Sequence, residues 1–432
     1  MSQSMRIACA LSLAVSAYSF SPKINNKRLV VKIKEGSSVE NIEVKSKKHL
    51  FKNYYILNTD NAQELKSYLE SNDLVEYAQF DFHSGEQELP QAQGAETLQE
   101  SVSEKPGMFN DPAVNKLWAF KSADRNGMNV SSAYEAFGRK GDQEVVVAVV
   151  DTGVDYNHED LKDVMWVNQN EIPGNGIDDD QNGYIDDVHG INTLMRDADG
   201  NATGDIMDKH DHGTHVAGTI GATQNNGVGI AGVASNVKIM GIRTVPNSGD
   251  ETDVDVAESF LYAAKMGAKV INCSFGKRNN ERGLLVQETI DHIGQEYGVL
   301  VVAAAGNESS NNDNSPKYPA SFNSENLLVV AATSSWRGSL AYFSNYGKRT
   351  VDIAAPGSGI YSTVRGSRYS NMSGTSMASP NMAGVAAEVL SRNPELSPYE
   401  LKDLLMNRVT KLSKFSLKMV SGGTANLKSA LE

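Results

Sequence analysis

Three short motifs supply a carboxylate, an imidazole and a hydroxyl in an order that suits nucleophilic catalysis. Asp151 ends the apolar run of VVAVVDTGVD, His212 lies in HDHGTHVAGT, and Ser376 lies in SGTSMASP. Each side chain stands beside Gly, Ala or Thr, where a strand-like run meets a helix-like run. A serine nucleophile needs a base within hydrogen-bond reach and a carboxylate that orients this base. Together the three motifs predict acyl transfer through these residues.

Each of these residues taken alone has a simpler structural interpretation. A serine before a helix is often an N-cap, a histidine in a small-residue helix is often structural, and an aspartate after a strand often belongs to a turn. Asp-Thr-Gly is also the signature of aspartic proteases, but the sequence has no second Asp-Thr-Gly or Asp-Ser-Gly. The Gly-x-Ser-x-Gly elbow of α/β hydrolases does not fit, because Ala378 replaces the second glycine.

The pattern of apolar runs predicts the elements that position these groups. Near-continuous apolar runs, typical of strands buried on both faces, occupy residues 145–150, 237–242, 269–275 and 299–305. Helix-like segments fall between or after them at residues 254–266, 285–297 and 379–391. This alternation predicts an α/β fold with a doubly wound, mostly parallel sheet. Asp151 and Asn307 follow such runs, and ligands bind outside the carboxyl ends of strands in these sheets.

The front of the chain divides into three parts. Residues 7–20 form an apolar run after Arg6, which is too short to span a bilayer and suits a secretory signal over residues 1–20. A buried N-terminal helix is the alternative interpretation. Residues 21–83 alternate strand-like and helix-like patterns and predict a small α/β unit, whereas residues 84–109 have little apolar content and predict a solvated linker. The main unit then covers residues 110–432.

Charge and cysteine content restrict the possible partners. The net charge of −13 argues against nucleic acid as the main partner. Residues 27–52 hold eight Lys or Arg and three Glu, so this segment carries +5 and the rest of the chain −18, and the two parts attract one another. Cys9 lies in the predicted signal, and we expect Cys273 to be a buried core residue. Outside the front segment no apolar run approaches 18 residues, so we expect no membrane span.

The three motifs resemble those of the subtilisin-like serine proteases, whose Asp, His, Ser order they share. The resemblance covers residues 110–432, and HGTHVAGT and GTSMASP are its most specific parts. It implies that Ser376 attacks a peptide carbonyl, that His212 transfers the proton and that Asp151 fixes the imidazole. It also implies that Asn307, in AAAGNES, donates a hydrogen bond to the oxyanion. The chain departs from the family at residues 381–382, which are Asn-Met rather than His-Val.

The resemblance also implies two segments that pair with the substrate backbone as edge strands. They consist of Ser274, Phe275 and Gly276, and of Ala304, Ala305 and Gly306. Phe275 and Gly276 predict an apolar wall for the side chain before the cleaved bond.

Two segments predict calcium sites. NGIDDDQNGYIDD, residues 175–187, has the ligand spacing of a calcium loop, although its twelfth position is not Glu, and a solvated acidic turn is the alternative. Its candidate ligands are Asp178, Asp180, Asn182, Tyr184 and Asp186, with Asp187 or a residue elsewhere to complete the shell. QNNGVGIAGVA resembles a calcium loop of the family. The ligands implied there are Asp160, the Asn226 side chain, the backbone carbonyls of Gln224, Val228 and Ile230, and Asp111 as a further ligand.

These features together predict a secreted or periplasmic serine endopeptidase that acts on polypeptides as a monomer and contains structural calcium. The N-terminal α/β unit resembles the family's inhibitory prodomain, which implies a self-processing zymogen cut within residues 84–109. A non-catalytic calcium-binding scaffold on the same fold is the main alternative, but it has no need for all four site residues. A peptide ligase that uses the same acyl-enzyme is a third possibility.

Overall fold

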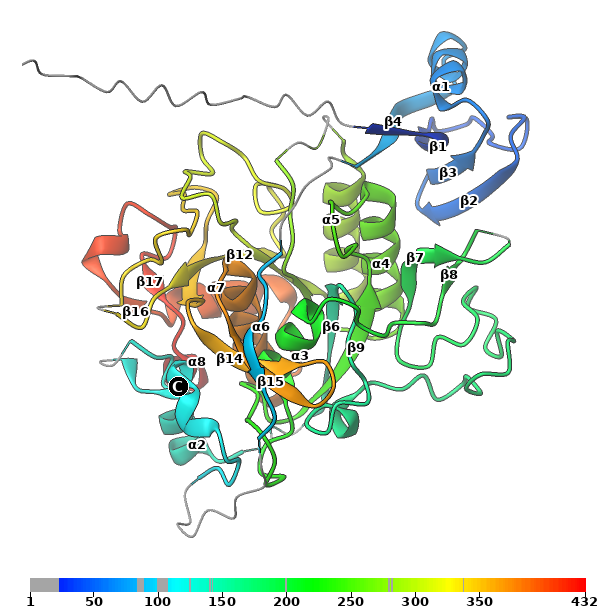
Figure 1. Cartoon of the computed structure of the whole chain (residues 1–432). Helices are drawn as coiled ribbons and strands as arrows, with labels where there is room; N and C mark the ends of the chain where they lie inside the picture. The colour runs from blue at the N-terminus through cyan, green and yellow to red at the C-terminus, as the bar shows by residue number, and fades with distance from the viewer. Residues whose placement is uncertain are drawn as a thin grey trace, which may run out of the picture.

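The computed structural model describes residues 23–83, 89–98, 108–123, 126–139, 141, 143–198, 200–278, 280, 283–336 and 338–432. A small unit, residues 23–83, lies beside a larger α/β unit, residues 108–432 (Figure 1). The predicted signal, residues 1–20, lies outside the described residues.

The N-terminal unit is a four-stranded antiparallel sheet with one helix packed on it. Its elements are β1 (Lys23–Ile33), β2 (Ser46–Phe51), β3 (Tyr54–Asn58), α1 (Ala62–Ser71) and β4 (Val75–His83), with the strands in the order β2-β3-β1-β4. Leu29 and Val31 alternate with Val30 along β1, and they pack with Leu65 and Leu69 of α1. Val30 instead joins the core that contains α4 and α5 of the larger unit. The alternation in the sequence therefore predicted β1 correctly, whereas β2 was not predicted.

The described residues of the larger unit form a ten-stranded sheet in the order β16-β17-β13-β12-β11-β10-β6-β9-β7-β8. Its central strands, β13 to β9 in that order, are all parallel. They are β6 (Val145–Asp151), β9 (Val237–Arg243), β10 (Val270–Cys273), β11 (Leu300–Ala304), β12 (Leu327–Thr333) and β13 (Ile353–Pro356). The outer strands are β7 (Asn192–Arg196), β8 (Ala202–Thr203), β16 (Thr410–Lys411) and β17 (Gly423–Thr424).

Helices cover both faces of this sheet (Figure 1). Val147 and Val149 of β6 pack with α3 (His212–Gly221) and α6 (Thr375–Arg392), whereas Ala148 and Val150 pack with α4 (Asp253–Lys265) and α5 (Leu285–Tyr297). Because successive side chains of a strand point to opposite faces, a strand buried on both faces is apolar throughout. The structure thus confirms the predicted doubly wound, mostly parallel sheet.

Shorter elements complete the larger unit. They are α2 (Val130–Phe137), α7 (Pro398–Asn407), α8 (Leu427–Leu431), the hairpin β14 (Ile360–Val364) and β15 (Arg368–Met372), and the 3-10 turns η1 (Val114–Lys116), η2 (Trp118–Phe120), η4 (Lys162–Val164) and η5 (Ser413–Phe415). Within the described residues, no helix combines the length and the apolar character that crossing a bilayer requires.

The segment between the two units is more ordered than the sequence predicts. Residues 93–96 form β5 (Gln93–Glu96), which pairs antiparallel with β15 and makes a three-stranded sheet with β14. Leu89 is buried in the core that also contains α4. This segment runs alongside β15 (Figure 1). Contacts with the distant hairpin thus give part of the predicted linker a regular structure, although most side chains of residues 93–96 remain exposed.

Candidate active site

The elements that carry the three predicted catalytic residues meet at the carboxyl end of the sheet. Asp151 is the last residue of β6, and His212 is the first residue of α3. Ser376 is the second residue of α6, which begins at Thr375 rather than at the predicted residue 379. Because α3 and α6 pack on each other and both pack on β6, residues far apart in the sequence come together.

Asp151 and His212 are joined by a direct hydrogen bond. His212 Nδ1 lies 2.7 Å from Asp151 Oδ1, and the same oxygen accepts the N–H of Thr152 at 2.7 Å. Gly213 makes this approach possible, since a Cβ there would lie 2.0 Å from the carbonyl oxygen of Gly153. Glycine after His212 is therefore required for the start of α3 to contact the end of β6.

Asp208 stabilises this junction, and the sequence analysis missed it. Its Oδ1 accepts the hydroxyl of Thr152 at 2.9 Å, and its Oδ2 accepts the hydroxyl of Thr214 at 2.6 Å. Asp208 is buried, so these hydrogen bonds join the loop after β6 to the first turn of α3. The only signal in the sequence was an aspartate four residues before His212.

The hydroxyl of Ser376 is directed at Ser274 rather than at His212. Ser376 Oγ donates to the carbonyl oxygen of Ser274 at 3.0 Å, and Ser274 Oγ donates to the carbonyl oxygen of Ser376 at 2.9 Å. The second of these bonds takes the place of an α-helical hydrogen bond. In a regular helix the carbonyl of Ser376 would accept the N–H of the residue four positions later, but that residue is Pro380, which has no N–H. His212 Nε2 is buried and has no hydrogen-bond partner among the described residues. The structure therefore pairs Asp151 with His212 but not His212 with Ser376.

Asn307 lies on an exposed loop after β11 and is fixed by α6. Its Oδ1 accepts the backbone N–H of Thr375 at 2.8 Å and the Thr375 hydroxyl at 3.0 Å. Nδ2 is left as a donor without an acceptor among the described residues. Asn307 Nδ2 and the backbone nitrogen of Ser376 each lie 3.5 Å from the point where a Cβ on Gly374 would stand. Since the first N–H groups of a helix have no partner within the helix, two donors converge beside the Ser376 hydroxyl.

The segment that contains β5 covers this site. Pro90 Cγ lies 3.0 Å from the same point beside Gly374, and Gln91 Nε2 lies 2.9 Å from His210 Nε2. Only 3% of Ser376 and none of His212 is exposed. Residues 89–91 therefore occupy the space that a peptide would need at Ser376.

The two predicted substrate-binding segments lie side by side. Ser274, Phe275 and Gly276 follow β10, and Ala304, Ala305 and Gly306 end or follow β11, its parallel neighbour. The Phe275 side chain is buried in the core together with Ala305. Cys273 is buried as expected, and burial raises the pKa of its thiol well above the ordinary value, so it stays protonated.

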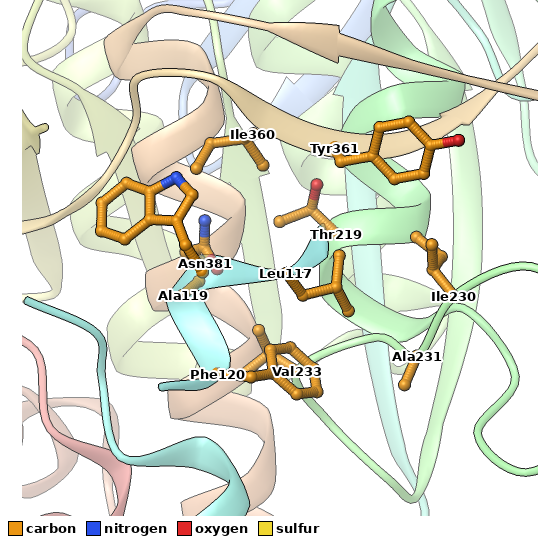
Figure 2. Close-up of a pocket in the computed structure, with 11 residues that line it drawn as sticks. Leu117, Ala119, Phe120, Thr219, Ile230, Ala231, Val233, Ile360, Tyr361 and Asn381 are labelled. Atoms are coloured by element: carbon orange, nitrogen blue, oxygen red, sulfur yellow. The ribbon is translucent and has the colours of Figure 1, made fainter. Parts of the chain in front are cut away.

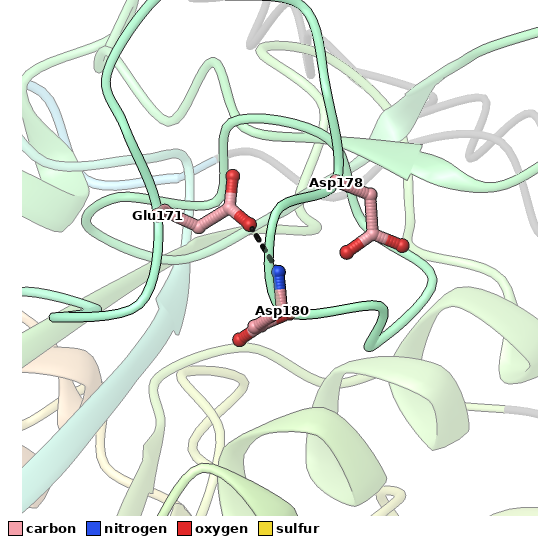
Figure 3. A group of neighbouring side chains, drawn as sticks. All are labelled: Glu171, Asp178 and Asp180. Atoms are coloured by element: carbon pink, nitrogen blue, oxygen red, sulfur yellow. Dashed lines mark hydrogen bonds between the residues drawn. The ribbon is translucent and has the colours of Figure 1, made fainter.

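A group of three carboxylates occupies the first predicted calcium loop. Ligand oxygens of Glu171, Asp178 and Asp180 all lie within 4.8 Å of one another (Figure 3). Glu171 is buried and accepts the backbone N–H groups of Asp179 at 2.8 Å and of Asp180 at 3.3 Å. Glu171 was not among the predicted ligands, because it precedes the loop and has no place in the spacing of the motif.

The remaining predicted residues of this loop have other contacts. Asn182 Nδ2 donates to Asp180 Oδ2 at 3.2 Å, and the hydroxyl of Tyr184 donates to Glu258 at 3.2 Å. Asp186 lies outside the group of three. Its two carboxylate oxygens instead accept backbone N–H groups, that of residue 174 at 2.7 Å and that of residue 176 at 3.1 Å.

Residues predicted for the second calcium site do converge. Asp160 accepts the Asn226 side-chain N–H at 2.8 Å and the Ile230 backbone N–H at 2.9 Å. Burial raises the pKa of Asp160 to about 7. Asp111 contacts the same loop, where it accepts the Asn226 backbone N–H at 3.2 Å. Gln224 follows α3 in the same loop, and its Oε1 is a buried acceptor without a partner among the described residues. Val228 donates its backbone N–H to the Asn226 side chain at 2.8 Å.

A small apolar cavity lies between η2, the loop after α3 and β14, and neither Asp151 nor His212 lines it (Figure 2). Its volume is about 20 Å³, which is room for about one water molecule. Asn381, where the chain departs from the family, lines it and donates to the carbonyl oxygens of Pro356 and Met377, both at 3.1 Å. We therefore assign this cavity to packing beneath α6.

Comparisons with known proteins agree with this geometry. The family profile described as "Subtilase family" matches residues 142–423. The chain belongs to the subtilase family. This subtilase is 33% identical over 376 residues to the thermophilic serine proteinase of Bacillus sp. (strain AK1), covering 86% of this chain and 77% of that protein. It is 32% identical over 347 residues to subtilisin-like protease 1 of Plasmodium berghei, covering 76% of this chain and 56% of that protein.

A solved protease structure from Pseudoalteromonas arctica PAMC 21717 is also similar to this subtilase. The TM-score is 0.60 at 28% identity, and the match covers 75% of this chain and 99% of that one. The expected family and fold class are thus confirmed. The chain spans about half the length of the Plasmodium relatives that it matches.

Proposed function

We propose that this subtilase is an active serine endopeptidase with Ser376 as nucleophile, His212 as general base and Asp151 as the residue that orients the imidazole. The observation that carries the proposal is the 2.7 Å hydrogen bond between Asp151 and His212 Nδ1. Because Nδ1 is held in this bond, the free Nε2 is the atom available to accept a proton. The Ser376 hydroxyl then turns from the Ser274 carbonyl to His212 Nε2 when substrate binds, since such hydrogen bonds often form only in the complex.

The reaction follows from these positions. Ser376 Oγ attacks the peptide carbonyl carbon while its proton passes to His212 Nε2. The oxyanion that forms accepts hydrogen bonds from Asn307 Nδ2 and from the Ser376 N–H. His212 then gives its proton to the leaving amine, and water hydrolyses the acyl-enzyme by the same route.

We further propose that the N-terminal unit is an inhibitory propeptide. It is joined to α4 and α5 by ion pairs, including Arg28 to Asp255 at 3.4 Å and Lys48 to Glu258 at 2.7 Å. The chain then continues over the site, where Pro90 fills the space beside Gly374. This arrangement supports a zymogen whose own linker occupies the cleft. The processed bond is then expected close to residues 89–91, within the range 84–109 that the sequence indicated.

Calcium is the proposed structural cofactor. The donors at both sites are carboxylate and amide oxygens, which are the ligands that Ca²⁺ prefers. Glu171, Asp178 and Asp180 would hold one ion, and three carboxylates this close together repel unless a cation neutralises them. Asp160 and the unpartnered Gln224 Oε1 support the second site. An ion bound there would stabilise the folded state and take no part in the chemistry.

Export and the monomeric state remain proposals. The support for a secreted or periplasmic location is the signal-like sequence of residues 1–20, and polypeptides are the proposed substrates.

The proposal is tested with Ser376→Ala and a matched control, Ser373→Ala, which removes an exposed hydroxyl three residues earlier. Ser376→Ala is expected to abolish peptide hydrolysis and to leave the full-length precursor uncut. Ser373→Ala should process and cleave as the wild type does. Appearance of normally trimmed protein in a purified Ser376→Ala preparation would contradict self-processing. Mass analysis of the products distinguishes hydrolysis from peptide ligation.

A further inference from the structure

A charged pocket lies next to the proposed substrate-binding segments. Its volume is about 300 Å³, at the lower end of the range for ligand pockets. Arg278, Glu308, Lys317 and Asn345 supply its charged and amide groups. We call it the charged pocket below.

The charged pocket stands directly behind the two glycines that end these segments. A Cβ on Gly306 would lie 2.7 Å from Glu308 Oε2 and 2.4 Å from Asn345 Nδ2. A Cβ on Gly276 would lie 3.6 Å from Lys317 Cε. Because neither glycine has a side chain, Glu308 and Asn345 approach the backbone of Gly306 closely, and Lys317 approaches that of Gly276. The groups of the charged pocket therefore stand directly against both proposed substrate-binding segments.

Glu308 supplies the carboxylate among the described residues that line the charged pocket, and both of its oxygens already have partners. Lys317 Nζ lies 2.6 Å from Glu308 Oε1, and Asn345 Nδ2 donates to Glu308 Oε2 at 2.6 Å. Although burial disfavours the charged form, Lys317 and Asn345 outweigh it and hold the pKa of Glu308 below its ordinary value. Glu308 therefore remains an anion with both oxygens occupied, and it has little capacity to bind a cationic substrate side chain.

The cationic groups of the charged pocket keep N–H donors that no described residue accepts. Lys317 is only 12% exposed, and an ammonium has three N–H donors, of which Glu308 takes one. Arg278 is exposed at the mouth of the pocket and adds a second positive charge. One carboxylate against two cations leaves a net charge of +1 among these residues. An anionic side chain would accept the remaining Lys317 N–H groups, whereas a cationic one would be repelled.

We propose that the charged pocket binds an acidic side chain, Glu or Asp, immediately before the cleaved bond, and that Lys317 is its specificity-determining residue. This proposal rests on the proposed function and names its substrate class. The wall predicted from Phe275 and Gly276 alone was apolar, because the sequence did not show that Glu308 and Lys317 stand behind it.

The test uses the processed enzyme and four fluorogenic peptides that differ only in the residue before the cleaved bond: Glu, Gln, Leu or Lys. Glu and Gln have the same shape, so their ratio of kcat/KM isolates the charge. We expect this ratio to be about tenfold to a hundredfold, the range of one charge-assisted hydrogen bond, and the Lys peptide to be cleaved most slowly.

Two variants move this ratio in opposite directions. Lys317→Met should reduce the Glu to Gln ratio to about one or below, while the Leu peptide is still cleaved. Glu308→Gln leaves Lys317 unpaired and should raise the ratio. The double variant Glu308→Gln with Lys317→Met removes both charges, so it keeps the test valid if the single Lys317 variant fails to fold.

The possible results distinguish failure of this proposal from failure of the proposed protease function. A wild-type enzyme that cleaves the Leu or Lys peptide better than the Glu peptide would overturn this proposal but leave the protease function standing. A Glu preference that survives in a folded Lys317→Met variant would also overturn it. Failure to cleave any of the four peptides, or any other peptide, would overturn the proposed function itself.

Discussion

Asn307 shows how one side chain can be fixed for a role in the transition state. Its Oδ1 is held by Thr375, so its Nδ2 is directed beside Ser376 before substrate arrives. Asn307→Ala is therefore expected to lower kcat by about a hundredfold to a thousandfold, the size measured for such a donor in subtilisin, a member of the same family. KM should change little. Asn314→Ala, an exposed asparagine in the same loop, serves as the control, and equal kcat values for both variants would contradict the assignment.

Burial of Glu251 makes the stability of the folded protein depend on pH. It is fully buried, Oε2 has no hydrogen-bond partner among the described residues, and burial raises the pKa of the carboxyl to about 8. The folded protein thus keeps a proton that the unfolded chain loses above its ordinary pKa of 4.5, so Glu251 lowers stability as pH rises from 4.5 to 8.

Glu251→Gln is therefore expected to raise the free energy of unfolding at pH 8 by about 1–4 kcal/mol and to leave it nearly unchanged at pH 4.5. The measurement is denaturant unfolding across this range in a Ser376→Ala background, which prevents autolysis. The control is Glu325→Gln, at an exposed position. The same stabilisation at both pH values would show that the effect does not come from titration.

The sequence was sufficient to predict the candidate catalytic residues, but not the residues that hold them and the acidic loop in place. Asp151, His212 and Ser376 lie in motifs whose residue types and order point to one chemistry. Asp208 and Glu171 act through burial and through contacts with backbone N–H groups, and neither property has a pattern in the sequence.

At the scale of elements, the acidic loop around residues 171–187 should depend on its cation. An ion that binds only the folded state stabilises it by mass action, by about 2.7 kcal/mol when its free concentration is a hundred times Kd. Excess chelator is therefore expected to lower the Tm of the Ser376→Ala protein, and calcium should restore it.

Glu171→Gln should reduce this calcium-dependent shift in Tm, because it removes a buried carboxylate oxygen from the group. Asp163→Asn, an exposed acidic residue in η4, is the matched control. An unchanged melting curve in excess chelator would contradict the calcium proposal at both sites.

Some helices and strands could be predicted from their own residues, and others could not. Strands β6, β9, β10 and β11 and helices α4 and α5 were predicted within about two residues at each end, since their apolar patterns are long and regular. β5 was not predicted, because its four residues, Gln93–Glu96, become a strand only through pairing with β15, more than 270 residues away. The start of α6 was predicted four residues late because the small residues before Ser379 have little periodicity.

At the scale of the whole molecule, the basic segment of the N-terminal unit, residues 27–52, interacts with the acidic larger unit as the charges predicted. Lys48 of β2 pairs with Glu258 of α4, a carboxylate that is buried and also contacts Arg196. Removing Lys48 leaves part of that charge uncompensated at the interface. The order of strands in the ten-stranded sheet, by contrast, could not be read from the sequence, because it depends on which strands pair in space.

Lys48→Ala is therefore expected to speed release of the N-terminal unit after processing by about tenfold or more, measured as a shorter lag before full peptidase activity. Lys45→Ala is the control, since Lys45 pairs with Asp60 at an exposed position inside the same unit. Equal lags for the two variants would show that this ion pair does not hold the units together.

The central claim is that Ser376 is a nucleophile activated by His212 and Asp151. The most direct measurement is intact and peptide mass spectrometry of the processed protein after reaction with a serine-reactive fluorophosphonate. One adduct per chain, located on Ser376 and lost on His212→Ala, is the predicted result. Labelling at a different serine, or equal labelling of the His212→Ala protein, would contradict the claim.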